Sequence, residues 1–174
     1  MTAFRAMCVC AFVVSSAARA DDGGGVLVGY GQAFQTRQDV EALSHLGVIG
    51  FGGRINDSTM ILADFQFGID DEHGDLTHLS LSFLGGYAIG PEAITFWVGG
   101  GLRFALDGYP NPSAALYDPG VGVGILSQFD GYGFGVDARG WLGMNWYCDR
   151  VTEEIEFGFD PYIEWRLYVS IGGF

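Results

Sequence analysis

Lysine is absent from the sequence, and eight arginines stand against 21 aspartates and glutamates, which leaves a net charge of −13. A chain this acidic has no electrostatic attraction for nucleic acid or for an anionic membrane surface, so no nucleic-acid partner is expected. No run of 18 uncharged apolar residues occurs in the 174 residues, which excludes a transmembrane helix. Charged residues make up 17% and hydrophobic residues 49%, so the chain is not intrinsically disordered.

Cysteine is nearly absent beyond the first 20 residues, where only Cys148 remains and no intramolecular disulfide can form. Residues 1–20 combine a basic Arg5, an apolar stretch and a closing Ala-Arg-Ala, which is the pattern of a cleaved signal peptide. We therefore predict export, with a signal peptide at 1–20 and a single domain at 21–174. After cleavage, six arginines would face all 21 carboxylates.

Strict alternation of bulky apolar residues with small or polar residues fills most of the remaining chain, the pattern of β-strands. The expected strands lie around 25–35, 45–55, 61–69, 79–89, 94–107, 121–125, 131–146 and 162–171. Tight turns at 56–58, 90–92 and 130–131 alternate with longer polar connections at 36–44, 70–77, 107–118 and 147–154. Short turns at one end and long loops at the other predict an up-and-down meander.

The bulky apolar face of these strands is too large to lie inside a barrel of eight strands. An eight-stranded TIM-barrel core holds roughly twelve inward side chains, far fewer than this face offers. The glycine-rich face must then line the lumen, and the bulky face must contact lipid. The predicted fold is an all-β, eight-stranded antiparallel up-and-down transmembrane β-barrel. A soluble periplasmic β-sandwich or barrel that binds an apolar ligand is the alternative, although strands of about ten residues suit a membrane better.

Several charged residues fall on the face expected to line the lumen. They are Asp64, Arg103, Asp137, Arg139, Glu164 and Arg166. Because an eight-stranded lumen is narrow, we expect these charges to pair near mid-depth and to block a continuous pore. A hydrated lumen that acts as a narrow pore is the alternative.

Aromatic residues on the outward face are expected to mark the two membrane interfaces. The candidates are Tyr132, Trp146, Trp165 and Phe174. Pro161 cannot donate to a strand ladder, so the last membrane strand should start at Tyr162, with 155–159 projecting beyond the bilayer. A bulge at 172–173 would bring Phe174 onto the outward face.

With these features the chain resembles the small eight-stranded outer-membrane β-barrels of Gram-negative bacteria, the OmpA-like transmembrane barrel family. The resemblance covers 21–174 and depends on the signal peptide, the alternating strands and turn lengths, and the terminal aromatic Phe174. It implies residence in the outer membrane and insertion by the barrel-assembly machinery, which reads a C-terminal aromatic strand. Members range over structural, adhesive and enzymatic roles.

No residue pattern points to catalysis, a cofactor or a metal site. His78 and Ser80 share the inward face of one strand without the His-x-Ser-Asn signature of barrel lipid A deacylases. The acidic loop at 70–75 lacks the spacing of an EF-hand and is expected to be a solvated loop. We therefore expect a non-enzymatic outer-membrane protein with a structural or loop-presenting role and no cofactor, the alternative being a lipid A-modifying enzyme. Protein partners of the loops cannot be named from the sequence.

Overall fold

The computed structural model describes residues 24–37, 40–70, 76–91, 93–107, 113–148 and 155–172. The expected signal peptide, most of the acidic loop at 70–75 and Phe174 lie outside these residues. The described part of the chain holds no helix that is long and apolar enough to cross a membrane.

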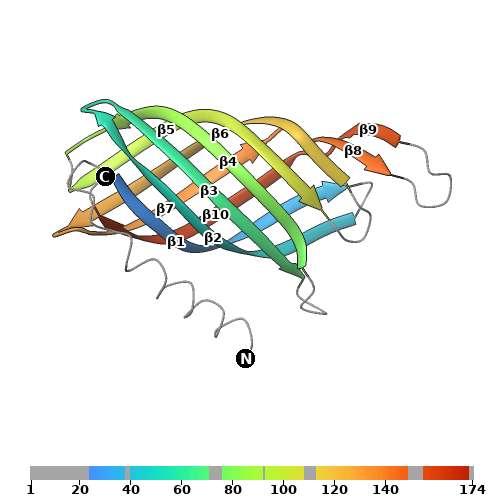
Figure 1. Ribbon diagram of the computed structural model, residues 1–174, viewed down its shortest axis with the longest axis horizontal. Helices are drawn as coiled ribbons and strands as arrows, with labels where there is room; N and C mark the ends of the chain where they lie inside the picture. The colour runs from blue at the N-terminus through green and yellow to red at the C-terminus, as the bar shows by residue number, and fades with distance from the viewer. Residues whose placement is uncertain are drawn as a thin grey trace.

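Ten β-strands form one antiparallel sheet that closes on itself into a barrel (Figure 1). They are β1 (Gly24–Arg37), β2 (Val40–Asn56), β3 (Thr59–Asp70), β4 (Leu76–Ile89), β5 (Ile94–Asp107), β6 (Ser113–Phe129), β7 (Tyr132–Trp141), β8 (Met144–Cys148), β9 (Ile155–Phe159) and β10 (Tyr162–Gly172). The pairing of β1 with β10 closes the barrel. β8 continues β7 along β6, and β9 leads directly into β10. The ten strands therefore occupy eight positions around the wall, and we call each of these positions a stave. The predicted eight-stranded antiparallel barrel is confirmed.

The last two staves are interrupted, whereas the sequence predicted one unbroken strand over 131–146. Gly143 adopts a φ of 69°, which ends β7, and Pro161 separates β9 from β10. The two breaks meet, since the Asp160 N–H donates to the Gly143 carbonyl at 2.8 Å. Beyond the breaks, β8 and β9 pair with each other and extend past the closed barrel (Figure 1).

Two connections are shorter than the sequence predicted. β1 ends at Arg37 and β2 begins at Val40, so most of the expected loop at 36–44 is strand. β6 begins at Ser113, which moves half of the expected loop at 107–118 into the wall. Neither extension has the strict alternation of apolar and polar residues from which the strands were predicted. The tight turn at 130–131 is a two-residue hairpin with positive φ at both positions, as predicted.

The stagger of the strands sets the width of the barrel. A walk around the wall from Tyr132, along directly paired residues, passes Ile171, Val26, Phe51, Ala63, Phe83, Leu102 and Pro119. The Pro119 carbonyl accepts from Leu142, so the walk returns ten residues further along the starting stave. Eight strands with this stagger tilt by roughly 40° and leave an interior that side chains can just fill.

The two faces of the wall differ in exposure and in chemistry. Along β7 exposed and buried residues alternate strictly from Tyr132 to Ala138, the exposed ones being on the apolar face. Outward-facing Val123 is 53% exposed and Phe134 is 58% exposed. The inward face carries the charged and hydroxyl side chains, which are almost completely buried.

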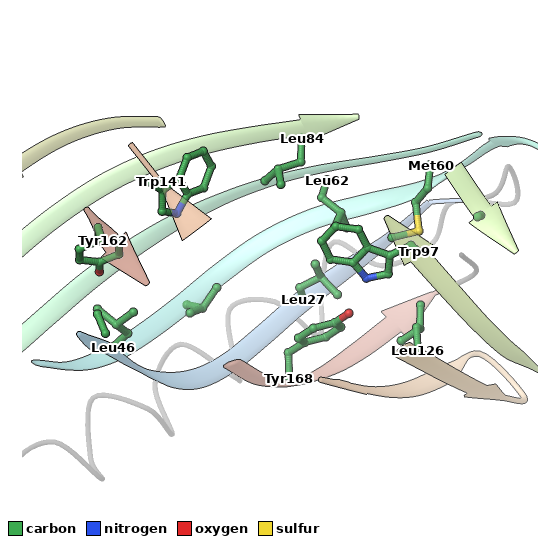
Figure 2. Close-up of a cluster of buried hydrophobic side chains, with 13 residues drawn as sticks. Leu27, Leu46, Met60, Leu62, Leu84, Trp97, Leu126, Trp141, Tyr162 and Tyr168 are labelled. Carbon is green, nitrogen blue, oxygen red and sulfur yellow. The ribbon is translucent and has the colours of Figure 1, made fainter. Parts of the chain in front are cut away.

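Apolar side chains also enter the lumen, in two groups (Figure 2). One group, towards the long-loop end, contains Leu46, Trp141 and Tyr162. The other, towards the short-turn end, contains Leu27, Met60, Leu62, Trp97, Leu126 and Tyr168. Successive inward positions of β10 run from Tyr162 through two charged residues to Tyr168, so a polar layer separates the two apolar groups.

Inward glycines are required by close approach inside the wall. A Cβ at Gly101 would overlap the carbonyl oxygen of Phe83, and one at Gly124 would lie 2.5 Å from the indole nitrogen of Trp97. Outward-facing Gly85 and Gly140 differ, because a Cβ there would meet nothing within 4 Å. Glycine therefore makes room for the lumen side chains.

We expect Gly101→Ala to destabilise the barrel by about 1–3 kcal/mol, because the added methyl group is forced against backbone. Gly85→Ala, on the neighbouring strand, should leave stability unchanged or raise it by about 0.4–1 kcal/mol. Urea unfolding of both variants in lipid vesicles measures the difference. Equal losses from both substitutions would contradict the placement of Gly101 towards the lumen.

Candidate functional site

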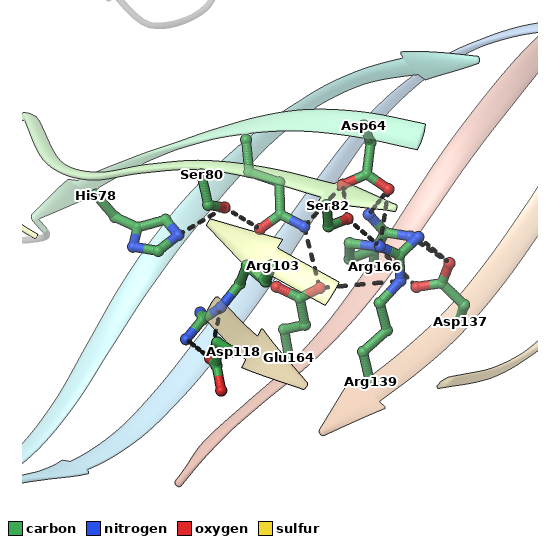
Figure 3. Close-up of polar contacts among 11 residues, drawn as sticks. Asp64, His78, Ser80, Ser82, Arg103, Asp118, Asp137, Arg139, Glu164 and Arg166 are labelled. Atoms are coloured by element: carbon green, nitrogen blue, oxygen red, sulfur yellow. Dashed lines mark hydrogen bonds and ion pairs between the residues drawn. The ribbon is translucent and has the colours of Figure 1, made fainter. Parts of the chain in front are cut away.

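The polar layer inside the barrel is the densest cluster of charged side chains in the described residues. Figure 3 shows carboxylates and guanidinium groups from β3, β5, β6, β7 and β10 converging in the lumen. The members are Asp64, Arg103, Asp118, Asp137, Arg139, Glu164 and Arg166, each at most 2% exposed. Six of these seven are the residues that the sequence placed on the lumen face, and Asp118 is an addition.

Arg166 links two carboxylates that come from different sides of the lumen. It lies directly opposite Asp137 in the β7–β10 ladder and donates to both oxygens of that carboxylate, at 2.7 and 2.5 Å. Its third nitrogen, Nη1, lies 2.9 Å from Asp64 Oδ2 on β3. A planar guanidinium is suited to this bridging geometry.

Arg139 completes a closed ring of two cations and two anions. Its Nη1 lies 2.8 Å from Asp64 Oδ2, and its Nη2 lies 3.4 Å from Asp137 Oδ2. The same Nη1 also donates to the Ser82 hydroxyl at 2.8 Å, which itself donates to Asp64. Within the ring each buried charge therefore has opposite charges beside it, which offsets the cost of its desolvation.

Glu164 is the least compensated charge of the layer. Its Oε1 accepts from Gln66 Nε2 at 3.0 Å and lies 3.9 Å from Arg139 Nε, while Oε2 has no hydrogen-bond partner among the described residues. The seven charged members comprise four carboxylates and three guanidinium groups. One negative charge thus lacks a full counter-ion, and Glu164 is the group with the fewest contacts to a cation.

Arg103 and Asp118 form a second ion pair nearer the long-loop end. Arg103 donates to Asp118 Oδ2 through Nε at 3.0 Å and through Nη2 at 2.6 Å. The other oxygen of Asp118 accepts the backbone N–H of Gly143 at 2.8 Å, so this side chain holds the break between β7 and β8. The guanidinium carbon of Arg103 lies 4.1 Å from the centroid of the Tyr162 ring, within the range of a cation–π interaction.

His78 and Ser80 are hydrogen-bonded to each other inside the lumen. His78 Nε2 lies 2.9 Å from Ser80 Oγ, and that hydroxyl donates to Gln66 Oε1 at 3.4 Å. Both side chains are buried, so the pair extends the polar layer towards the Tyr162 ring on which His78 stacks.

The described residues contain no cluster of three or more His, Cys, Asp or Glu side chains that could hold a metal ion.

Three of the four aromatic residues expected at the membrane interfaces lie among the described residues. Tyr132 and Trp146 are exposed on the outer face near opposite ends of their stave. Trp165 lies opposite Ala138, six positions from Tyr132, with its ring edge-to-face on Tyr30. Phe174 lies outside the described residues.

No family model and no curated protein matches the sequence. Solved structures do match. Neisserial surface protein A is 16% identical with a TM-score of 0.63 over 87% of this chain and 97% of its own. Ail, the attachment invasion locus protein of Yersinia pestis, crystallised with the heparin analogue sucrose octasulfate, is 11% identical with a TM-score of 0.54 over 86% of this chain and 97% of its own. The chain therefore has the fold of the small eight-stranded outer-membrane β-barrels, as the sequence resemblance implied.

We expect Asp137→Asn to lower the free energy of unfolding by about 3–5 kcal/mol, because it leaves Arg166 buried without its bidentate partner. Glu164→Gln should cost less than about 1 kcal/mol, because the amide still accepts from Gln66 and the uncompensated charge is removed. Urea unfolding of the two isosteric variants in lipid vesicles tests this difference. Equal losses would mean that water or ions in the lumen screen all four carboxylates alike.

Proposed function

We propose that this chain is an integral protein of the outer membrane, exported through a signal peptide at 1–20, with a structural or loop-presenting role and no enzymatic activity. The observation that carries the proposal is a wall whose outer face is apolar all round and whose lumen holds a layer of paired charges. A soluble protein has the opposite arrangement.

Exposure of the outer face to water would be costly. Large apolar side chains at about 40–70% exposure occur on every stave of the barrel. Monomeric soluble proteins rarely expose a contiguous apolar patch of more than about 300–600 Å². In a bilayer the same side chains contact acyl chains, so the fold needs no apolar ligand to cover them, and this argues against a soluble periplasmic role.

The ends of the barrel suit the two membrane interfaces. Tyr132 and Trp146 are 14 residues apart on one stave, roughly 35 Å along the membrane normal at a tilt of about 40°. This distance brackets the apolar band of about 25 Å in such barrels together with both interfaces. β10 and Phe174 would form the C-terminal strand recognised by the barrel-assembly machinery.

The ion-paired layer supports a closed lumen rather than a pore. Arg139 and Arg166 each reach from their own stave to Asp64 on β3, which lies across the lumen. Apolar side chains lie on both sides of this layer, so an ion would have to displace them as well. We expect purified protein in planar bilayers to give no steady single-channel conductance.

A polyanionic ligand like the sucrose octasulfate bound to Ail does not suit this chain. The sequence has no lysine and a net charge of −13, so sulfate groups would be repelled. A lipid A-modifying activity is not supported either, because the His78–Ser80 pair is buried in the lumen, away from the lipid-facing surface.

Fractionation of cells that express the full chain tests the proposal directly. We expect the protein in the outer-membrane fraction, dependent on detergent for solubility, with a heat-dependent shift in migration on SDS gels. A monomer that is soluble without detergent would overturn the proposal.

Two arginine substitutions separate the lipid-facing wall from the projecting hairpin. Val123→Arg on the outer face of β6 should cost about 2–4 kcal/mol and reduce insertion, because it places a charge near mid-membrane. Ile155→Arg on β9 should have little effect, because β9 lies beyond the closed barrel. The heat-shifted fraction on SDS gels measures both, and equal tolerance would contradict the proposed position of the bilayer.

A further inference from the structure

A hollow lies on the outer face of the wall, and no side chain of the described residues fills it. It spans the four neighbouring strands β2–β5 and has a volume of about 520 Å³. Ala63, Gly85 and Gly100 contribute small outward-facing residues, and Phe51, Phe83 and Phe104 contribute the largest lining side chains. We refer to this hollow as the β2–β5 groove.

The floor of the groove consists of two glycines that nothing inside the barrel requires. Gly85 lies directly opposite Gly100 in the β4–β5 ladder. A Cβ at Gly85 would meet nothing within 4 Å, and one at Gly100 would meet only the Gly120 carbonyl oxygen, at 3.3 Å. Glycine weakens a strand interior, so Gly85, which no close contact requires, and the Gly100 opposite it point to use of the space above them.

Gly47, another outward-facing glycine, differs from Gly85 because an aromatic ring covers it. Gly47 on β2 lies opposite Phe67, and the Phe67 ring occupies the space where a Cβ of Gly47 would be. An aromatic ring that covers a glycine across a ladder restores the packing that the glycine lacks. No such ring lies over Gly85, since the three atoms nearest to its Cβ position are all beyond 4 Å.

The walls of the groove select for an apolar occupant. Every lining residue is apolar and none has a side-chain hydrogen-bonding group. Gly85 is four residues from the end of β4 at Ile89, and Gly100 is six residues from the start of β5 at Ile94. At the tilt of the barrel these positions lie roughly 10–15 Å from the short-turn end, at the depth of acyl chains in the nearer leaflet.

We propose that the β2–β5 groove binds one acyl chain of a phospholipid from the leaflet at the short-turn end of the barrel. The proposal depends on the membrane residence proposed above and names a ligand that this residence alone does not require. A second copy of the chain is a poorer occupant. In a two-fold dimer the same surface of each copy faces the other, so the groove of one copy would face the groove of its partner and neither groove would be filled.

The test compares three leucine substitutions at outward-facing glycines. Gly85→Leu and Gly100→Leu fill the groove, whereas Gly140→Leu places the same side chain at an outward position on β7 that does not line this groove. Each protein is inserted into vesicles of phosphatidylethanolamine and phosphatidylglycerol and extracted in mild detergent. Native mass spectrometry then measures the retained phospholipid.

We expect the unsubstituted protein and Gly140→Leu to retain one phospholipid, and the two groove variants to retain at least tenfold less. Equal retention by all variants, or no retention by the unsubstituted protein, overturns the proposal. A dimer of the unsubstituted protein that Gly85→Leu dissociates also overturns it, because the groove would then be a contact between copies.

Heat-dependent migration on SDS gels establishes that each variant is folded. If Gly85→Leu does not fold, Phe83→Ala removes a wall instead of filling the floor and should also reduce retention at least fivefold. A protein that is soluble without detergent would refute the membrane role itself. A protein that inserts and shifts on heating but retains no phospholipid would refute the groove alone.

Discussion

The narrow interior left by eight strands with a stagger of ten residues is the constraint on which the rest of the structure depends. It leaves too little space inside for the full apolar face of every strand, so most of the bulky apolar side chains lie on the outer face. It also brings side chains from opposite staves within hydrogen-bonding distance. A charge on the inner face therefore meets another side chain before it meets bulk water, and Arg103, Arg139 and Arg166 each have a carboxylate partner.

The ion pairs specify the barrel more than they stabilise it. Burial of three guanidinium groups costs desolvation energy, and the attraction of well-placed carboxylates only roughly offsets that cost. A one-residue slip of β10 against β7 would turn Arg166 outwards into the apolar face and leave Asp137 unpaired in the lumen. Asp64 on β3 contacts both Arg139 on β7 and Arg166 on β10. A shift in register that turned Asp64 outwards would therefore also leave buried charges unpaired, although β3 is not a neighbour of β7 or β10. The network thus selects one register among the many that alternating strands permit.

Features that depend on alternation along the chain could be read from the sequence, and features that depend on three-dimensional contacts could not. The period of two placed Asp137 and Arg166 on one face, and the meander made β7 and β10 neighbours. Asp118 was placed in a loop because 113–118 has little apolar alternation, yet it is strand and holds the β7–β8 break through Gly143. The sequence could not show that Glu164 has the weakest contact with a cation either. That depends on the three-dimensional position of Arg139, which lies closer to Asp64 than to Glu164.

The same constraints separate the wall of the barrel from the hairpin at the long-loop end. The charged layer and both apolar groups lie within the closed barrel, where β7 and β10 pair along their lengths. β8 and β9 lie beyond it and pair with each other, and their exposed Trp146, Phe157 and Phe159 rings contact one another rather than the lumen. Asp118, the Asp160–Gly143 hydrogen bond and the short β6–β8 ladder join this hairpin to the barrel. Substitutions in the outward-facing side chains of the hairpin therefore leave the ion pairs that fix the register of the barrel in place.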